Sequence, residues 1–240
     1  VEDKGQWAMI FNETVKSDSN PVDRTEKFMF DGERLIQHII KQRYFEEEIS
    51  NEVNLSYSDN QVTVTTDYLT LVYTLNSEGY ASQCVYSLSS QNRIYQFSYS
   101  AEGYLTGIVE NIDDTEYSST SLTYENGDIT SISSKMNGLE NKFIYEPGEE
   151  SSTYHLPCLG LLEIHPLTFH IEALYAGLLG KDPRHFTMHS CPAGSNDEKT
   201  VYSYGFDKKG NPSRMICQTT YAGGQASYYP YTRNISISFE

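Results

Sequence analysis

Residues 95–109 read YQFSYSAEGYLTGIV, and this stretch predicts a β-hairpin. Tyr95, Phe97 and Tyr99 fall on alternate positions, which places their rings on one face of a strand and the polar residues between them on the other. Gly103 closes the acidic turn that follows, where a positive φ lets the chain reverse into its partner strand. We therefore expect a positive φ at Gly103, and also at Gly79 in the equivalent turn.

The same phrase recurs along the chain. Gly79, Gly103 and Gly127 follow one another at intervals of 24 residues, and looser copies lie elsewhere. One hairpin cannot bury its aromatic face alone, so repeated hairpins are expected to lie side by side. The sequence thus predicts an all-β fold: an antiparallel β-meander of tandem hairpins with about 12–14 strands. The looser copies occupy residues 27–36, 55–64 and 202–212.

The alternation stops near residue 146, and a helical pattern replaces it. Leu167, Ile171, Leu174 and Leu178 recur at helical spacing. Their spacing predicts one helix at about 167–179, packed on or in the sheet, with these four side chains buried against the aromatic face.

The pattern also predicts how the chain is divided. Residues 1–25 are polar and weakly patterned, so we expect a strap or linker there. Residues 26–240 are expected to form a single β-meander domain, with a helical insertion at 155–195.

Composition narrows the possible partners. The chain has 240 residues, 20 of them Tyr, and a formal net charge of −16. An acidic surface repels phosphate, so no nucleic-acid partner is expected, and no apolar run is long enough for a transmembrane helix. The chain begins with Val1 instead of Met, so we expect that a signal peptide has been removed.

The segment 155–191 concentrates histidine and cysteine. The spacings His155-x-x-Cys158 and His185-x-x-x-His189-x-Cys191 could ligate zinc, which suggests a hydrolase or metal-dependent enzyme as an alternative function. However, they match no established zinc motif, and H-E-x-x-H and G-x-S-x-G are both absent. No catalytic or cofactor-binding residue and no cofactor is therefore predicted, and the only candidate metal ligands are His185, His189 and Cys191.

The cysteines allow two interpretations. The chain has four, none in C-x-x-C spacing, so up to two disulfides could form in an exported protein. The interpretation we favour is that they are small buried apolar residues.

The hairpin phrase resembles, more distantly, the YD/RHS-type β-hairpin repeats. Together with LYAGLLGK at 174–181, it is similar to uncharacterised Bacteroidetes-type lipoprotein domains, a domain of unknown function with porin-like fold. The resemblance implies that the meander forms a strongly curved sheet or a closed barrel, with the helix packed on or in it. It also implies export to the periplasm or outer membrane and a lipid anchor on a Cys upstream of Val1. It implies no catalytic residues.

Three functions follow as hypotheses. The favoured one is a monomeric, non-catalytic cell-envelope domain that binds a glycan or an envelope protein or acts as a scaffold, because a Tyr-rich sheet offers aromatic platforms. The second is the enzyme that would use residues 155–191. The third is an outer-membrane barrel, suggested by the closing alternation of Ile235, Ile237 and Phe239. Against it, the alternating runs are short and their opposite faces polar.

Overall fold

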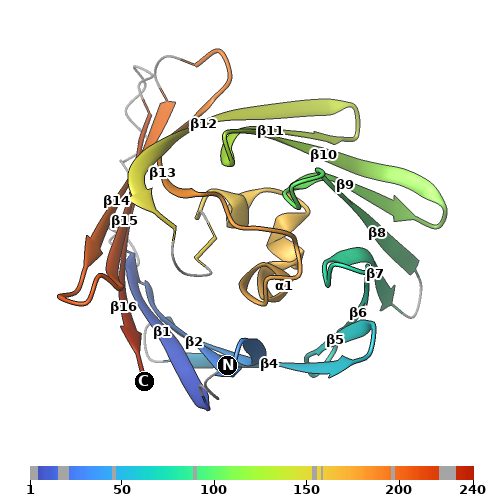
Figure 1. The fold of residues 1–240 in the computed structure, drawn as a ribbon, viewed down its shortest axis with the longest axis horizontal. Coiled ribbons are helices and arrows are strands. Elements are labelled where there is room, and N and C mark those ends of the chain that lie inside the picture. Colours follow the sequence, from blue (N-terminus) through green and yellow to red (C-terminus); the bar gives the residue numbers. More distant parts are fainter. Residues whose placement is uncertain are drawn as a thin grey trace. The chain divides into compact units, whose positions relative to one another are not determined.

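The structure is a computed structural model that describes residues 5–15, 22–44, 47–88, 91–152, 156–157, 159–195, 198–221 and 231–240. Its elements are almost all strands (Figure 1). The strands are β1 (Gln6–Val15), β2 (Val22–Asp31), β3 (Arg34–Tyr44), β4 (Glu47–Ser58), β5 (Gln61–Thr65), β6 (Thr70–Leu75), β7 (Ala81–Leu88), β8 (Gln91–Tyr99), β9 (Leu105–Ile112), β10 (Thr115–Glu125), β11 (Asp128–Met136), β12 (Leu139–Ser151), β13 (His185–Pro192), β14 (Glu198–Phe206), β15 (Pro212–Tyr221) and β16 (Tyr231–Phe239).

The strands follow one another in sequence order as an antiparallel meander. This order closes on itself, because β1 pairs with both β2 and β16, so the sheet is a closed 16-strand barrel. The predicted all-β meander is therefore confirmed, and the closed barrel is the correct member of the two predicted alternatives. The expected 12–14 strands were too few.

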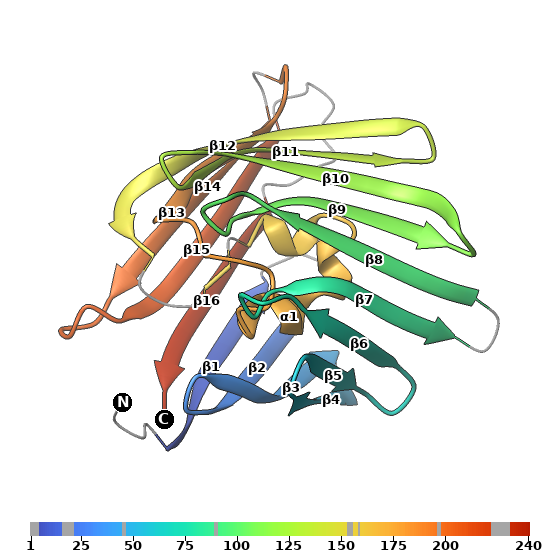
Figure 2. The same cartoon turned by 45° about the vertical axis from the view of Figure 1, so that its right-hand side comes forward.

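The chain forms two compact units. One comprises residues 1–54 and 194–240, and the other comprises residues 55–193. In the second unit, β7 to β13 curve around the short helix α1 (Ile171–Tyr175), as both Figure 1 and Figure 2 show. None of the helices in the described ranges is long and apolar enough to cross a membrane.

The hairpins with the strict 24-residue interval are neighbours in the second unit. They are β6–β7, β8–β9 and β10–β11, adjacent in the sheet. The expected positive φ is confirmed, with values of 86° at Gly79 and 92° at Gly103. Tyr95 and Phe97 of β8 are buried, as the alternation predicted.

The N-terminal segment is a strand where the sequence suggested a strap. Residues 6–15 form β1, and β2 begins at Val22. The alternation of β1 is hidden because Glu13 occupies a buried position, where both its carboxylate oxygens accept hydrogen bonds from Arg233 of β16. A buried charge of this kind is tolerated only when it is paired, and a hydrophobic pattern cannot reveal it.

The helical insertion is shorter and more broken than predicted. In place of one helix at 167–179, the chain forms the 3₁₀ turns η1 (Leu161–Glu163) and η2 (Leu167–Phe169) and then α1. Helix α1 ends at Tyr175, and Gly177 just beyond it has a φ of 69°. There the N–H groups of Gly177 and Leu178 donate to the carbonyls of Leu174 and Ala173, respectively, which is a Schellman ending. The sequence placed the glycine that terminates the helix at Gly180, three residues beyond Gly177.

The predicted buried face of the insertion is only partly correct. Leu167 and Leu178 are buried, but Ile171 and Leu174 are half-buried. Ala173 and Tyr175 are buried in their place, because the break before α1 changes the face that packs against the sheet.

Residues 178–184 follow α1 and cross the ends of the three hairpins. From here on, the term strap refers to these residues alone and not to the N-terminal segment. The Leu178 carbonyl accepts from the Ala81 N–H (2.7 Å), and the Lys181 N–H donates to the Gly103 carbonyl (2.9 Å). The Arg184 N–H donates to the Gly127 carbonyl (3.0 Å). The strap therefore makes a backbone contact at every third residue, one to each successive hairpin.

The close approach of the strap to the hairpin turn at Gly103 leaves no room for a side chain at position 180. A Cβ on Gly180 would lie 2.7 Å from the Gly103 carbonyl oxygen, at a φ of +88°. Gly79 has a similar φ of +86°, but nothing lies within 4 Å of its Cβ position. Gly79→Ala should therefore cost about 1–2 kcal/mol for the left-handed backbone alone, and Gly180→Ala should cost at least about 1 kcal/mol more through the clash.

Urea titration of the two alanine variants and the unsubstituted chain measures both costs. Equal losses of unfolding free energy in the two variants would contradict the close contact between the strap and the turn at Gly103.

Candidate functional site

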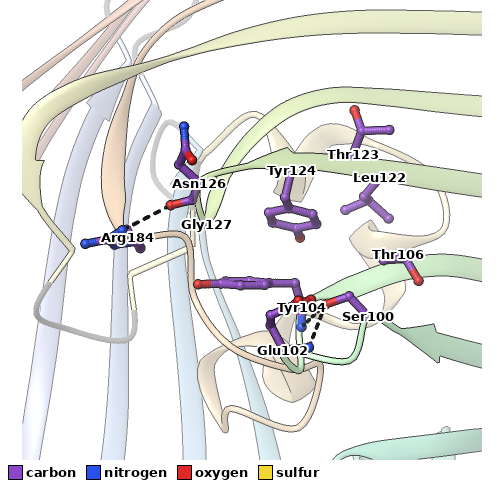
Figure 3. Close-up of a pocket in the computed structure, with 10 residues that line it drawn as sticks. All are labelled: Ser100, Glu102, Tyr104, Thr106, Leu122, Thr123, Tyr124, Asn126, Gly127 and Arg184. Atoms are coloured by element: carbon purple, nitrogen blue, oxygen red, sulfur yellow. Dashed lines mark hydrogen bonds between the residues drawn. The ribbon is translucent and has the colours of Figure 1, made fainter.

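A pocket of about 640 Å³ opens where two of the hairpins separate. The ladder between β9 and β10 ends at the pair Gly107–Ser121. Each of these strands stays paired with its other neighbour beyond that point, β9 with β8 as far as Leu105 and β10 with β11 as far as Glu125. The hairpin ends β8–β9 and β10–β11 thus diverge and leave the pocket between them (Figure 3).

Two tyrosines dominate the pocket. The rings of Tyr104 and Tyr124 stack with centroids 4.9 Å apart and an interplanar angle of 28°. Figure 3 shows the rings facing each other, with the Tyr104 hydroxyl directed toward the side where Arg184 lies. The remaining lining residues are mostly polar: Ser100, Glu102, Thr106, Leu122, Thr123, Asn126, Gly127 and Arg184.

The repeated turn holds Tyr104 in place. The Ser100 hydroxyl oxygen accepts from the N–H groups of Glu102 (3.2 Å) and Tyr104 (3.3 Å), and the Ser100 N–H donates to the Tyr104 carbonyl (2.8 Å). A serine at the first position of the turn commonly makes such local bonds. The hairpin phrase therefore encodes the position of the pocket's first aromatic ring.

The strap supplies the cation of the pocket. In addition to its backbone contact with Gly127, Arg184 donates from Nη1 to the Asn126 carbonyl (3.3 Å). Arg184 therefore lines the pocket together with the two tyrosines, although it lies far from both in the sequence.

The charges in the pocket are balanced, because Glu102 and Arg184 carry opposite signs. Hydrogen bonding from Ser100 and from its own backbone holds the pKa of Glu102 below its usual value, so this carboxylate is ionised at neutral pH. Burial, with Asp182 and Tyr104 nearby, raises the pKa of the Tyr124 phenol. The pocket thus offers hydroxyls, an amide, a carboxylate and a guanidinium around aromatic faces, which suits a ligand rich in hydroxyl groups.

Residues 159–177, which precede the strap and which we call the inward segment, are anchored through His165. Its Nε2 is hydrogen-bonded to the buried Glu110 carboxylate of β9. Its carbonyl accepts from Thr120 of β10 and Ser134 of β11, each at 3.2 Å. The single residue His165 therefore ties the inward segment to three neighbouring strands.

Glu110 is satisfied by hydrogen bonds from the sheet itself. Its carboxylate also accepts from the Ser118 hydroxyl (2.7 Å), the Tyr95 hydroxyl (3.2 Å) and Arg93 Nη1 (3.2 Å). Burial acts to raise the pKa of Glu110, but the hydrogen bonds from His165 and Ser118 outweigh it, and the pKa is lowered. Arg93, Tyr95, Ser118 and His165 all belong to the second unit. The role of this network is therefore structural.

His170 is buried among aromatic rings and is neutral. Its Nδ1 is hydrogen-bonded to the Tyr73 hydroxyl (2.7 Å), and the ring meets Tyr95 edge-on with centroids 4.4 Å apart. Burial lowers the pKa of His170 from 6.5 to about 3. Its Nε2 has no hydrogen-bond partner among the described residues, so a second proton, which would give the buried ring a charge, is costly.

The candidate metal ligands do not form a metal site in the described part of the chain. His185 Nδ1 contacts Asp128 (2.8 Å) and His189 Nδ1 contacts Glu146 (2.8 Å), so the two histidines of β13 have separate carboxylate partners. Cys191 is a free thiol, as are the buried Cys84 and Cys217.

No group of three or more His, Cys, Asp or Glu among the described residues could hold a metal ion. His155 and Cys158, whose spacing was also noted, lie outside the described residues.

The sequence did not identify the pocket residues. Tyr104 belongs to the repeated phrase, so a tyrosine directly after the turn glycine, as at Tyr80 and Tyr104, was the available signal. Arg184 carried no such signal, because its place in the pocket depends on the divergence of β9 from β10 and on the path of the strap.

The closed meander, with its inward segment, places the chain in the class of porin-like β-barrel domains. The chain belongs to the family described as "Domain of unknown function (DUF4595) with porin-like fold", whose model matches residues 28–214.

Solved structures similar to this chain include two porin-like proteins. A porin-like protein from Bacteroides uniformis ATCC 8492 is 27% identical with a TM-score of 0.88, covering 97% of this chain and 96% of that one. A porin-like protein from Bacteroides vulgatus ATCC 8482 is 12% identical with a TM-score of 0.56, covering 95% of this chain and 96% of that one, which shows the fold alone. No curated protein matches the chain.

The neutral, buried state of His170 predicts a dependence of stability on pH. Below pH 6.5 the unfolded chain gains a proton that the folded chain does not take up until its pKa of about 3. Stability present above pH 6.5 is therefore lost as the pH falls, at about 1.4 kcal/mol per pH unit, or about 2 kcal/mol by pH 5.

A double variant that removes both members of the pair isolates this contribution. In Tyr73→Phe/His170→Leu the fall in unfolding free energy between pH 7 and pH 5 should be smaller by about 2 kcal/mol. Tyr73→Phe alone keeps the histidine and should retain the steep fall. A double variant with the slope of the unsubstituted chain in denaturant titrations would show that His170 is not held neutral.

Proposed function

We propose that this chain is a non-catalytic, glycan-binding domain of the cell envelope, and that the Tyr104–Tyr124 pocket is its binding site. The observation that carries the proposal is the stacked tyrosine pair at an open pocket with a polar rim. The apolar face of a sugar ring packs on an aromatic ring, and its hydroxyls exchange hydrogen bonds with side chains at the rim. Glu102, Asn126 and Arg184 provide acceptors and donors at that rim.

The overall charge favours a neutral glycan. The formal net charge of −16 repels polyanionic chains, and Arg184 is the single cation among the described residues that line the pocket. A ligand with many hydroxyls and no net charge avoids this repulsion.

The lining of the pocket supports binding instead of hydrolysis. Glycoside hydrolysis normally uses a pair of carboxylates on either side of the scissile bond. Among the described lining residues, Glu102 is the single carboxylate. The proposed role is therefore recognition alone.

The envelope location is supported by the similarity to porin-like proteins from Bacteroides. A lipid anchor on a segment upstream of Val1 belongs to the same proposal, as does the removal of a signal peptide. The outer-membrane barrel is less well supported, because the exposed positions of β8 and β10 include polar residues where a lipid-facing strand needs apolar ones. These residues are Gln96, Ser98, Ser121 and Thr123.

Replacing Tyr104 tests the proposed site. Tyr104→Ala removes one face of the stacked pair and should weaken glycan binding by about 2 kcal/mol, roughly 30-fold, as for other aromatic anchors. The measurement is a screen of neutral oligosaccharides against the purified chain, followed by calorimetry of those that bind.

Tyr68→Ala provides the matched control. Tyr68 is 74% exposed and lies outside the pocket, in the loop between β5 and β6, so its removal should leave affinity unchanged. If Tyr104→Ala and Tyr68→Ala bind the same glycan equally well, the pocket is not the binding site.

A further inference from the structure

The surroundings of Gly103 and Gly127 are built in the same way. A Cβ on Gly103 would meet the Tyr80 ring at 3.2 Å and Cε of Lys181 at 3.4 Å. A Cβ on Gly127 would meet the Tyr104 hydroxyl at 2.7 Å and Cδ of Arg184 at 2.5 Å. Each glycine is thus covered by a tyrosine from the preceding hairpin and a cation from the strap.

The aromatic partners repeat as well. Tyr80 packs on Tyr99 with ring centroids 5.3 Å apart, and Tyr104 packs on Tyr124 with centroids 4.9 Å apart. In both pairs, the tyrosine that follows one hairpin turn meets the tyrosine that precedes the next turn. We call the two groups the Gly103 cell (Tyr80, Tyr99, Gly103 and Lys181) and the Gly127 cell (Tyr104, Tyr124, Gly127 and Arg184).

The distance between the two cells follows from sheet geometry. A hairpin is two strands wide, so equivalent points on successive hairpins lie roughly 10 Å apart. The strap advances three residues between Lys181 and Arg184, and extended chain also covers roughly 10 Å in three residues. The two spacings agree, which is why the strap can place one cation in each cell.

A ligand that uses both cells must repeat at the same interval. An extended β-1,4-linked chain of pyranose rings is flat and repeats every disaccharide, at about the width of one hairpin. An α-1,4-linked chain coils and presents no straight repeat of this length. A polyproline helix also has a repeat close to this value, roughly 9 Å. However, the polar lining of the Gly127 cell by Glu102, Asn126 and Arg184 suits hydroxyl groups better than proline rings.

We infer that the Gly103 and Gly127 cells bind successive disaccharides of one extended, neutral β-1,4-linked glycan. This inference rests on the proposed glycan-binding function and specifies its ligand. The chain of sugars would run across the hairpin ends, parallel to the strap, with one tyrosine pair beneath each disaccharide.

Oligosaccharides of different length and linkage test the inference. Calorimetry would compare disaccharides with tetrasaccharides of β-1,4-linked glucose, mannose, xylose and N-acetylglucosamine, with maltotetraose as the coiled control. The intact chain should bind one of the β-1,4-linked tetrasaccharides at least about tenfold more tightly than its disaccharide, because the second cell is engaged by a linked ligand. Maltotetraose should show no such gain.

Substitutions in each cell assign the gain. In Tyr80→Ala the tetrasaccharide should bind no more tightly than the disaccharide, whereas Tyr104→Ala should weaken the binding of both. Tyr68 belongs to neither cell, so Tyr68→Ala should bind both oligosaccharides as tightly as the unsubstituted chain does.

The outcomes separate the two proposals. If a disaccharide binds through Tyr104 but the tetrasaccharide gains nothing, or if Tyr80→Ala keeps the full gain, the extended site is wrong and the glycan pocket stands. An equal gain with maltotetraose also overturns the extended site. If no oligosaccharide binds the intact chain, both proposals fail, and binding of a proline-rich peptide that is lost in Tyr80→Ala would identify a polyproline ligand instead.

Discussion

The backbone hydrogen bonds between the strap and the hairpin turns organise the second unit. They join Leu178, Lys181 and Arg184 to three successive hairpins, at an interval that matches the width of a hairpin. Because backbone groups make these bonds, they require close approach, which glycine at 103, 127 and 180 permits. The same bonds fix where the strap side chains lie, and so place Arg184 beside the stacked tyrosines.

The inward segment before the strap is held by a second, polar set of contacts. His165 joins the buried Glu110 to the neighbouring strands, while His170 fills an aromatic site without carrying a charge. The two histidines therefore have different roles, one as a partner of a carboxylate and one as a neutral ring in the core. Neither needs a metal ion to explain its position, and each contact lies within residues 55–193.

The sequence predicted the parts of the fold that depend on local patterns. Tyr95 and Phe97 alternate in β8 as expected, and Gly79 and Gly103 have the positive φ that their turns need. Prediction failed where a distant residue decides the outcome. Glu13 hides the alternation of β1 because Arg233 pairs with it, and the pocket depends on Arg184 reaching the turn at Gly127. The end of α1 was ambiguous, since Gly177 and Gly180 both satisfy the local rule for a terminating glycine.

The central claim is that the strap is bonded in register to the hairpin turns, and amide hydrogen exchange followed by NMR tests it most directly. The N–H groups of Ala81, Lys181 and Arg184 make the bonds in question, so their exchange should be slowed to rates similar to those of amides within β8 and β9. If Lys181 and Arg184 exchange as fast as amides in an unstructured peptide while the neighbouring strands remain protected, the strap is not held by the turns. The cells built on it would then not exist as described.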